Sequence, residues 1–167
     1  HLSFFSYPDL PLLIFIGRLT NAKKLDILID AFMCLNQNDI KYNLLLIGDG
    51  EEKENLKTKA NEFIQKGCIY FYGPSYNEEE NGKYLSLADL CVSPGNVGLT
   101  AIHSLSYGTP VITHDNFSNQ MPEFEAILPG KTGTFFKEDN PNDLAVKIKE
   151  WFGSPTNNKY IEDNCYK

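Results

Sequence analysis

The sequence has little positive charge and no long hydrophobic run. Its 15 lysines and arginines are outnumbered by 22 aspartates and glutamates, which gives a formal net charge of −7 at pH 7. Proteins that coat nucleic acid need a basic surface for the phosphate backbone, so we expect no nucleic-acid partner. No run reaches the roughly 18 consecutive apolar residues of a membrane span, and the first residues lack the pattern of a secretory signal.

Cysteine pairs and metal-ligand clusters are also missing. The four cysteines form no Cys-x-x-Cys motif, and the three histidines lack the spacing of metal ligands. Cys34, Cys68 and Cys91 lie within apolar runs, where a free thiol packs as a small, buried hydrophobic group. These observations predict a reducing, cytoplasmic location, no metal ion and no cofactor.

Three common motifs of nucleotide-binding and hydrolytic enzymes are absent. The segment GDGEEK at 48–53 has Lys53 where a dinucleotide fingerprint needs its third glycine, and it follows the second apolar run instead of the first. In PGKTG at 129–133, Glu125 stands where a phosphate loop needs its first glycine. No Gly-x-Ser-x-Gly occurs, so redox dinucleotide enzymes, P-loop enzymes and α/β-hydrolases are all disfavoured.

The chain does contain a regular alternation of apolar runs and amphipathic segments. With 167 residues and 42% hydrophobic residues, it can bury one substantial core. Continuous apolar runs are typical of parallel strands buried on both faces, and the segments between them have helical spacing. We therefore predict a doubly wound α/β domain, a parallel sheet with helices on both faces that binds ligands at the carboxyl ends of its strands. The predicted strands are 12–16, 42–47, 68–72, 90–92, 110–113 and 133–136, and the predicted helices are 23–36, 51–66, 78–87, 98–107 and 141–152.

A single domain is expected over residues 1–167, with no internal repeat or linker. Because the first residue is His1 and not Met, we expect this domain to be excised from a longer, two-domain chain. Residues 153–167 form a polar tail interrupted by Pro155, which is expected to cross the surface or fray. The stretch 115–131 is the longest without periodicity, and such loops are usually functional or disordered.

Cations and glycines follow the first and fourth predicted strands. Arg18 comes directly after Gly17, and Lys23 opens the next helix, so both could reach one anion above the sheet. Gly98 allows close approach of backbone to a ligand, and the helix after it points free amides at the same place. Together these groups suit a bound or departing diphosphate. Taken singly, each cation could instead be an ordinary solvated charge.

The polar residues around these groups have alternative structural interpretations. His103 points near the glycine loop, but a merely structural, hydrogen-bonded histidine is also compatible with the pattern. His114, Asp115 and Asn116 could form only a turn, and Glu123 could be a solvated loop carboxylate.

Five segments, in order and spacing, resemble the carboxyl-terminal domain of group 1 retaining glycosyltransferases of the GT-B fold. They are FIGRLTNAKKLDILIDAF, LLLIGDGEEKENLKTKA, IYFYGPS, LADLCVSPGNVGLTAIHSLSYGTPVIT and PEFEAILPGKTGTFF, and together they cover roughly residues 12–152. In that family this domain, a Rossmann-like half, binds the nucleotide-sugar donor, and an amino-terminal domain supplies most of the acceptor site.

The resemblance implies metal-independent transfer of a sugar with retention at the anomeric carbon. Arg18 and Lys23 are then the catalytic candidates, because they would hold the donor diphosphate and stabilise it as it departs. The backbone amides of Gly98, Leu99 and Thr100 would lie opposite these cations. The implied donor-binding set comprises Gly17, Tyr72, Gly73, Asn96, Gly98, Leu99, Thr100, His103 and Glu123, with the base against Tyr72 and Gly73.

The sequence departs from the family at a pair of glutamates separated by seven residues. The first falls on Gly95 and the second on His103, which could still hydrogen-bond the ribose, whereas Gly95 cannot replace a carboxylate that contacts the sugar. Glu123, with Asn96 and Asp115, is the expected source of replacement contacts to the sugar hydroxyls.

The resulting hypothesis is the donor-binding half of a glycosyltransferase, with UDP or GDP as the nucleotide and a glycan or a lipid-linked molecule as acceptor. We expect the isolated domain to catalyse little, and any contact with the inner face of a membrane to be made through the missing domain. Two alternatives are a nucleotide-sugar epimerase on the same architecture and a non-catalytic interaction module.

Overall fold

The computed structural model describes residues 2–155 and 158–166. Its strands are β1 (Leu12–Ile16), β2 (Asn43–Ile47), β3 (Ile69–Gly73), β4 (Leu90–Ser93), β5 (Val111–His114) and β6 (Gly133–Phe136). Its α-helices are α1 (Leu25–Leu35), α2 (Lys53–Gln65), α3 (Glu78–Leu87), α4 (Thr100–Ser106), α5 (Pro141–Gly153) and α6 (Asn158–Cys165). Short 3₁₀ helices are η1 (Asn21–Lys23), η2 (Phe117–Asn119) and η3 (Pro122–Ala126).

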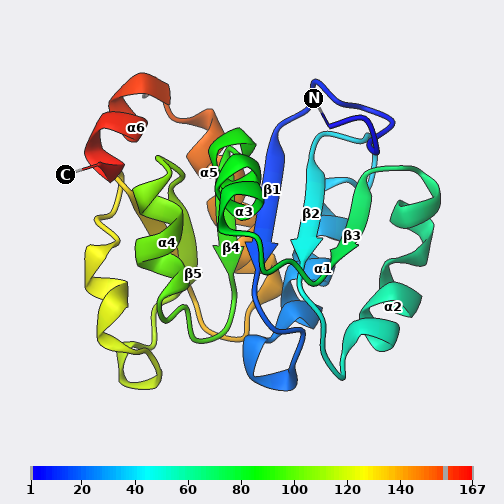
Figure 1. Ribbon diagram of the computed structural model, residues 1–167, viewed down its shortest axis with the longest axis horizontal. Helices are drawn as coiled ribbons and strands as arrows, with labels where there is room; N and C mark the ends of the chain where they lie inside the picture. Colours follow the sequence, from blue (N-terminus) through cyan, green and yellow to red (C-terminus); the bar gives the residue numbers. More distant parts are fainter. Residues whose placement is uncertain (1, 156–157, 167) are drawn as a thin grey trace.

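The six strands form one parallel sheet in the order β3-β2-β1-β4-β5-β6. The chain winds outward from β1 to β3, crosses to β4 and then winds outward in the other direction. In Figure 1, α3 and α4 lie in front of the sheet, and α1 and α5 lie behind it. This arrangement confirms the predicted doubly wound α/β fold with helices on both faces.

Alternate strand residues face opposite helix layers. Leu13 and Phe15 of β1 belong to a buried cluster with residues of α1, α2 and α5, whereas Leu12 and Ile14 pack in a second cluster with residues of α3, α4 and α6. All four side chains are at most 2% exposed. Burial on both faces explains why the sequence of β1 is a continuous apolar run and not an alternating one.

The observed strands lie within one residue of their predicted bounds, and the main differences lie toward the carboxyl terminus. The tail expected to cross the surface or fray contains helix α6, and Cys165 at its end is buried. The loop 115–131 is not simply irregular, because it contains η2 and η3. The described residues do not include His1, residues 156–157 or Lys167. What was predicted for these positions, at the first residue and within the polar tail, stays a prediction.

One of the three cysteines predicted to be buried is exposed. Cys34 lies on α1 between the positions of its apolar stripe and faces solvent, which corrects the prediction. Cys68 and Cys91 are buried as expected, and burial raises the pKa of the Cys68 thiol to about 11 and that of Cys91 to about 12. Those two thiols stay protonated and unreactive at neutral pH. Among the helices of residues 2–155 and 158–166, none has the length and apolar character needed to cross a membrane.

The loops after β1, β2 and β3 are joined to one another by backbone hydrogen bonds. The amide of Gly17 donates to the carbonyl of Ile47 at 3.0 Å, and the amide of Gly48 donates to the carbonyl of Gly73 at 2.9 Å. A Cβ on Gly48 would overlap the carbonyl oxygen of Gly17 and lie 2.9 Å from its carbon. Glycine at position 48 therefore allows the loops after β1 and β2 to be in contact. This packing explains the glycine of the GDG segment without a bound dinucleotide.

We expect Gly48→Ala to lower the free energy of unfolding by about 3 kcal/mol, because the added methyl group meets backbone that has no room to move. The measurement is urea unfolding. Gly153→Ala is the matched control, since a Cβ at this last residue of α5 meets nothing within 4 Å, and its expected change is below about 1 kcal/mol. Equal stability of the two variants would contradict the close-contact explanation.

Candidate functional site

The candidate site lies where the direction of winding changes, between β1 and β4. Both strands end at the lower edge in Figure 1, and their loops leave the sheet side by side because the strands are paired. In open α/β sheets such a point leaves a crevice at the carboxyl ends of the strands, where ligands bind. The sequence places its candidate cations after β1 and its glycine loop after β4, so the fold brings these two groups to one edge.

The glycine loop after β4 packs directly on η1. A Cβ on Gly95 would overlap the carbonyl oxygen of Ala22 and lie 2.9 Å from the Cα of Lys23. This contact allows Lys23 Nζ to donate a hydrogen bond to the carbonyl of Asn96 at 3.0 Å. Burial lowers the pKa of Lys23. Because one of its three N–H donors is used by Asn96, two remain for a ligand.

Arg18 lies at the same sheet edge and has different neighbours. It is exposed and lines a cavity of about 530 Å³ together with Gly17 and residues of the loops after β2 and β3, among them Tyr76. In the part of the chain that the structure describes, neither Arg18 nor Lys23 has a carboxylate within 4.0 Å. Two cations are thus left without an acidic partner at this edge.

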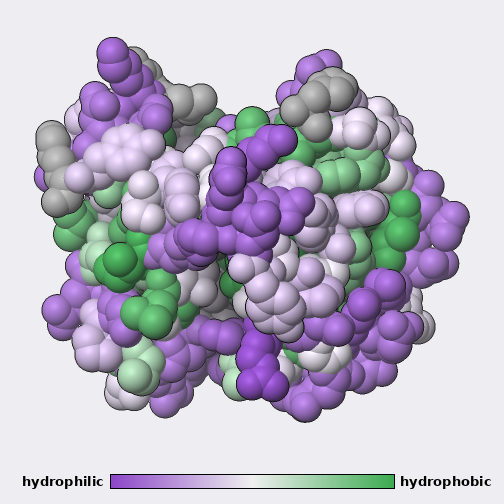
Figure 2. Space-filling model, in the orientation of Figure 1, coloured by the Kyte–Doolittle hydropathy of each residue, from purple (hydrophilic) through white to green (hydrophobic). Residues whose placement is uncertain are grey.

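The start of α4 provides part of the expected set of free amides. The amide of Thr100 is occupied, because it donates to the carbonyl of Val97 at 3.2 Å. The structure records no acceptor for the amides of Gly98 and Leu99 among the described residues. Two of the three predicted amides are therefore available to an anion. The side chain of Leu99 is 74% exposed, and apolar surface gathers over α4 at the left of Figure 2.

His103 is engaged with α3 instead of lying free at the loop. Its Nε2 lies 2.7 Å from Glu78 Oε1, and the hydroxyl of Tyr107 donates to the same oxygen at 3.0 Å. These hydrogen bonds from His103 and Tyr107 lower the pKa of the Glu78 carboxyl. Any ligand contact of His103 is therefore shared with a carboxylate that sequence reasoning did not anticipate.

The predicted base-binding residues at the end of β3 are only partly available. The hydroxyl of Tyr72 donates to Glu80 on α3, and Ser75 Oγ donates to the other oxygen of that carboxylate at 3.3 Å. The hydrogen bond to Glu80 raises the pKa of Tyr72. Gly73 is open, since a Cβ there would meet nothing within 4 Å. A ligand can approach the backbone at Gly73, while the Tyr72 hydroxyl is held by α3.

Several buried polar atoms lack a hydrogen-bond partner among the described residues, and two of them belong to the predicted donor-binding set. Asn96 Oδ1 and Glu123 Oε2 have no hydrogen-bond donor among the described residues. Glu123 lies on η3, which is held in place because the ring of Phe124 stacks on that of Phe117 with centroids 4.5 Å apart. Asp115 is exposed, and its Oδ1 accepts the amide of Glu138 at 3.2 Å. Unpartnered buried acceptors suit the hydroxyl donors of a ligand.

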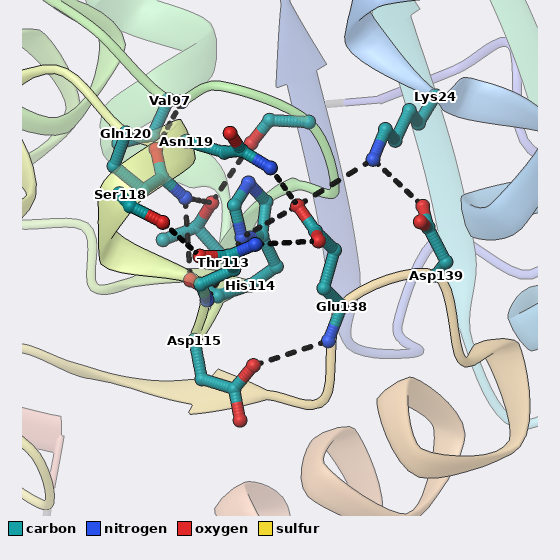
Figure 3. A network of polar contacts seen from close by, with 12 residues as sticks. Lys24, Val97, Thr113, His114, Asp115, Ser118, Asn119, Gln120, Glu138 and Asp139 are labelled. Atoms are coloured by element: carbon teal, nitrogen blue, oxygen red, sulfur yellow. Dashed lines mark hydrogen bonds and ion pairs between the residues drawn. The ribbon is translucent and has the colours of Figure 1, made fainter.

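A polar network that sequence reasoning missed connects β5 and the loop after it with the glycine loop and with the segment after β6 (Figure 3). Gln120 bridges the amide of Val97 and the hydroxyl of Thr113. Glu138 accepts hydrogen bonds from Asn116 at 2.9 Å and Asn119 at 3.3 Å.

The same network encloses His114 and reaches Lys24. His114 is buried, its Nδ1 accepts the amide of Asn116 at 3.1 Å, and burial lowers its pKa. Lys24 pairs with Glu138 at 3.6 Å and Asp139 at 2.7 Å. No local sequence pattern identifies such contacts, because they join loops that are distant along the chain. A search of the described residues finds no group of three or more His, Cys, Asp or Glu side chains that could hold a metal ion.

Comparison with known proteins gives one family. The family model described as glycosyl transferases group 1 matches residues 3–167. The glycogen synthase of Edwardsiella ictaluri is 28% identical over 165 residues, which cover 92% of this chain and 34% of that enzyme. The chain spans between 25% and 41% of the length of the first curated relatives that it matches.

Solved structures share the fold at low sequence identity. A mutant of TarM from S. aureus, crystallised in complex with fondaparinux, alpha-GlcNAc-glycerol and UDP, superposes with a TM-score of 0.80 at 20% identity, covering 93% of this chain and 31% of that one. The C-terminal domain of LpcC, a group 1 family glycosyl transferase from Francisella tularensis, has a TM-score of 0.76 at 18% identity, covering 98% of this chain and 88% of that one. With the family model matching nearly the whole sequence, the chain belongs to the group 1 glycosyltransferases.

Proposed function

We propose that the chain is the donor-binding half of a retaining glycosyltransferase, which transfers a sugar from a nucleoside-diphosphate sugar to a glycan or lipid-linked acceptor. One observation carries the proposal. Lys23, which has no acidic partner in the described residues, donates to the carbonyl of Asn96, in the same loop whose amides at Gly98 and Leu99 have no recorded acceptor there. This loop lies at the carboxyl edge of the sheet, where ligands of this fold bind, which supports a shared role of the cation and the amides. The UDP in the TarM complex supports a nucleotide of this kind.

The proposed chemistry is stabilisation of a departing diphosphate. When the bond between the anomeric carbon and the diphosphate breaks, negative charge grows on the bridging oxygen. Lys23 and Arg18 offer positive charge there, and the amides of Gly98 and Leu99 offer donors that need not reorient. Preorganised donors of this kind each change rates by roughly 10²–10³-fold in enzymes. We assign no protein nucleophile and no metal.

The burial of Lys23 favours this role. Burial lowers its pKa, because the charged form loses hydration. A bound diphosphate supplies the missing negative charge and returns the pKa upward, so binding and full protonation support each other. Lys24 is already neutralised by Glu138 and Asp139 and is not available in this way.

The sugar would be held by acceptors near the glycine loop. Glu123 Oε2 and Asn96 Oδ1 are buried and have no hydrogen-bond partner in the part of the chain that the structure describes, and sugar hydroxyls are donors that could satisfy both. Gly95 offers no carboxylate, so Glu123 is the replacement that we propose. An amino-terminal domain of a longer chain would supply the acceptor site and any membrane contact, and this chain alone would bind donor and catalyse little.

A non-catalytic module on the same fold is the second candidate. It is favoured by the loss of both family glutamates, at Gly95 and His103, and by the contact of His103 with Glu78. If the chain is such a module, it should bind no nucleotide. Measuring nucleotide binding therefore distinguishes the module from the glycosyltransferase.

We expect UDP or GDP to bind the chain and the affinity to fall by more than about 100-fold in the double variant Arg18→Ala, Lys23→Ala. The reason is the loss of two charge-assisted contacts, each of about 1.5–3 kcal/mol. Isothermal titration calorimetry with each nucleotide measures the change. The charge-matched control, Lys147→Ala with Lys149→Ala on α5, should bind as the unaltered chain does. Absence of heat with both nucleotides favours the non-catalytic module.

We expect Glu123→Ala to weaken binding of a nucleotide sugar about tenfold and to change binding of the bare nucleotide less than twofold, because its carboxylate would contact the sugar alone. UDP-glucose, UDP-GlcNAc and GDP-mannose are the probes, each compared with UDP or GDP by calorimetry. Glu125→Ala, an exposed neighbour on the same η3 helix, is the control. Equal losses for sugar donor and bare nucleotide would assign Glu123 another role.

A further inference from the structure

The side-chain amide of Gln120 connects β5 with the glycine loop (Figure 3). Its Oε1 accepts the amide of Val97 at 3.0 Å. Its Nε2 donates to Thr113 Oγ1 at 2.9 Å and to the carbonyl of His114 at 3.2 Å. Donor and acceptor of the amide are both used, so its orientation is fixed by three contacts.

Thr113 connects the same strand with the beginning of the loop. Its side chain is fully buried, and its hydroxyl lies 2.7 Å from the carbonyl of Ser93 and 3.1 Å from that of Gly95. Thr113 therefore anchors the loop before Asn96, and Gln120 anchors it after Asn96 at Val97. The carbonyl of Asn96, between the two anchors, is the atom that receives Lys23 Nζ.

We infer that Gln120 is a positioning residue, which holds the glycine loop so that the carbonyl of Asn96 captures Lys23 in the geometry needed for the diphosphate. The inference rests on the proposed function, since it concerns the same site. Gln120 itself touches neither Lys23 nor Arg18 and acts through the backbone of Val97 and Asn96. Its effect on the nucleotide therefore requires Lys23 to be present.

Two substitutions distinguish the acceptor of the Gln120 side chain from its donor. Gln120→Met keeps the length of the side chain and removes both its acceptor and its donor. Gln120→Glu keeps an acceptor for the amide of Val97, but places a second oxygen against the hydroxyl of Thr113 and the carbonyl of His114. Gln65→Met, at the exposed end of α2, makes the same chemical change away from the site and is the control.

The test is calorimetry with UDP and GDP on each variant, in the native and the Lys23→Ala background, well below every melting temperature. We expect Gln120→Met to raise the dissociation constant about tenfold when Lys23 is present and less than twofold when Lys23 is alanine. Gln120→Glu should raise it at least as much as Gln120→Met, because its carboxylate repels the carbonyl of His114 and adds negative charge near the diphosphate. Gln65→Met should leave it unchanged. A role in stability alone would lower the melting temperature and leave the affinity of the folded protein unchanged.

The possible results distinguish failure of the positioning role from failure of the proposed function. An unchanged affinity of Gln120→Met, or equal losses in both backgrounds, overturns the positioning role while the proposed function stands. If the unaltered chain binds neither UDP nor GDP, the proposed function fails and this inference fails with it.

Discussion

The site depends on the contact of two backbones at Gly95. Because position 95 carries no side chain, the loop after β4 lies against Ala22 and Lys23 of η1. That approach brings Lys23 within hydrogen-bond distance of the carbonyl of Asn96. A side chain at position 95 would overlap the carbonyl of Ala22 and push the two segments apart, so the contact between Lys23 and Asn96 in this chain depends on Gly95. The departure of Gly95 from the family pattern is thus part of how this site is built.

The carboxylates missing from the loop and from α4 have counterparts on α3. Glu78 binds His103 and Tyr107, and Glu80 binds Tyr72 and Ser75. Both glutamates lie in the first turn of α3, where the positive end of the helix dipole stabilises negative charge. The first turn of α3 therefore supplies acceptors to residues of the β3 loop and of α4. This arrangement keeps negative charge close to the site although the β4 segment itself contributes none.

The fold could be predicted from the sequence because parallel strands that are buried on both faces consist of continuous apolar runs. The ends of each run then give the bounds of the strand. LLIFI of β1 shows this directly, since its bounds are those predicted. Helix α6 was not predicted because its polar residues show no such run. The site could be predicted only where chemistry is local: Arg18, Lys23 and the glycine loop follow strand ends. Gln120 and Glu78 could not be found, since their partners are 23 and 25 residues away in sequence and only the packing of the helices and loops brings them together.

The two adjacent lysines at the start of α1 show why charge is available at this edge of an acidic protein. Lys24 adopts a left-handed backbone conformation, with φ of 52°, which turns the chain between η1 and α1. Its ammonium pairs with Glu138 and Asp139 after β6, whereas that of Lys23 donates to a neutral carbonyl, that of Asn96. A carbonyl orients an ammonium without cancelling its charge. Of the two lysines, Lys24 is paired with carboxylates, and Lys23 has no carboxylate within 4.0 Å among the described residues. A cation without an acidic partner is thus present at this edge although the chain carries a net charge of −7.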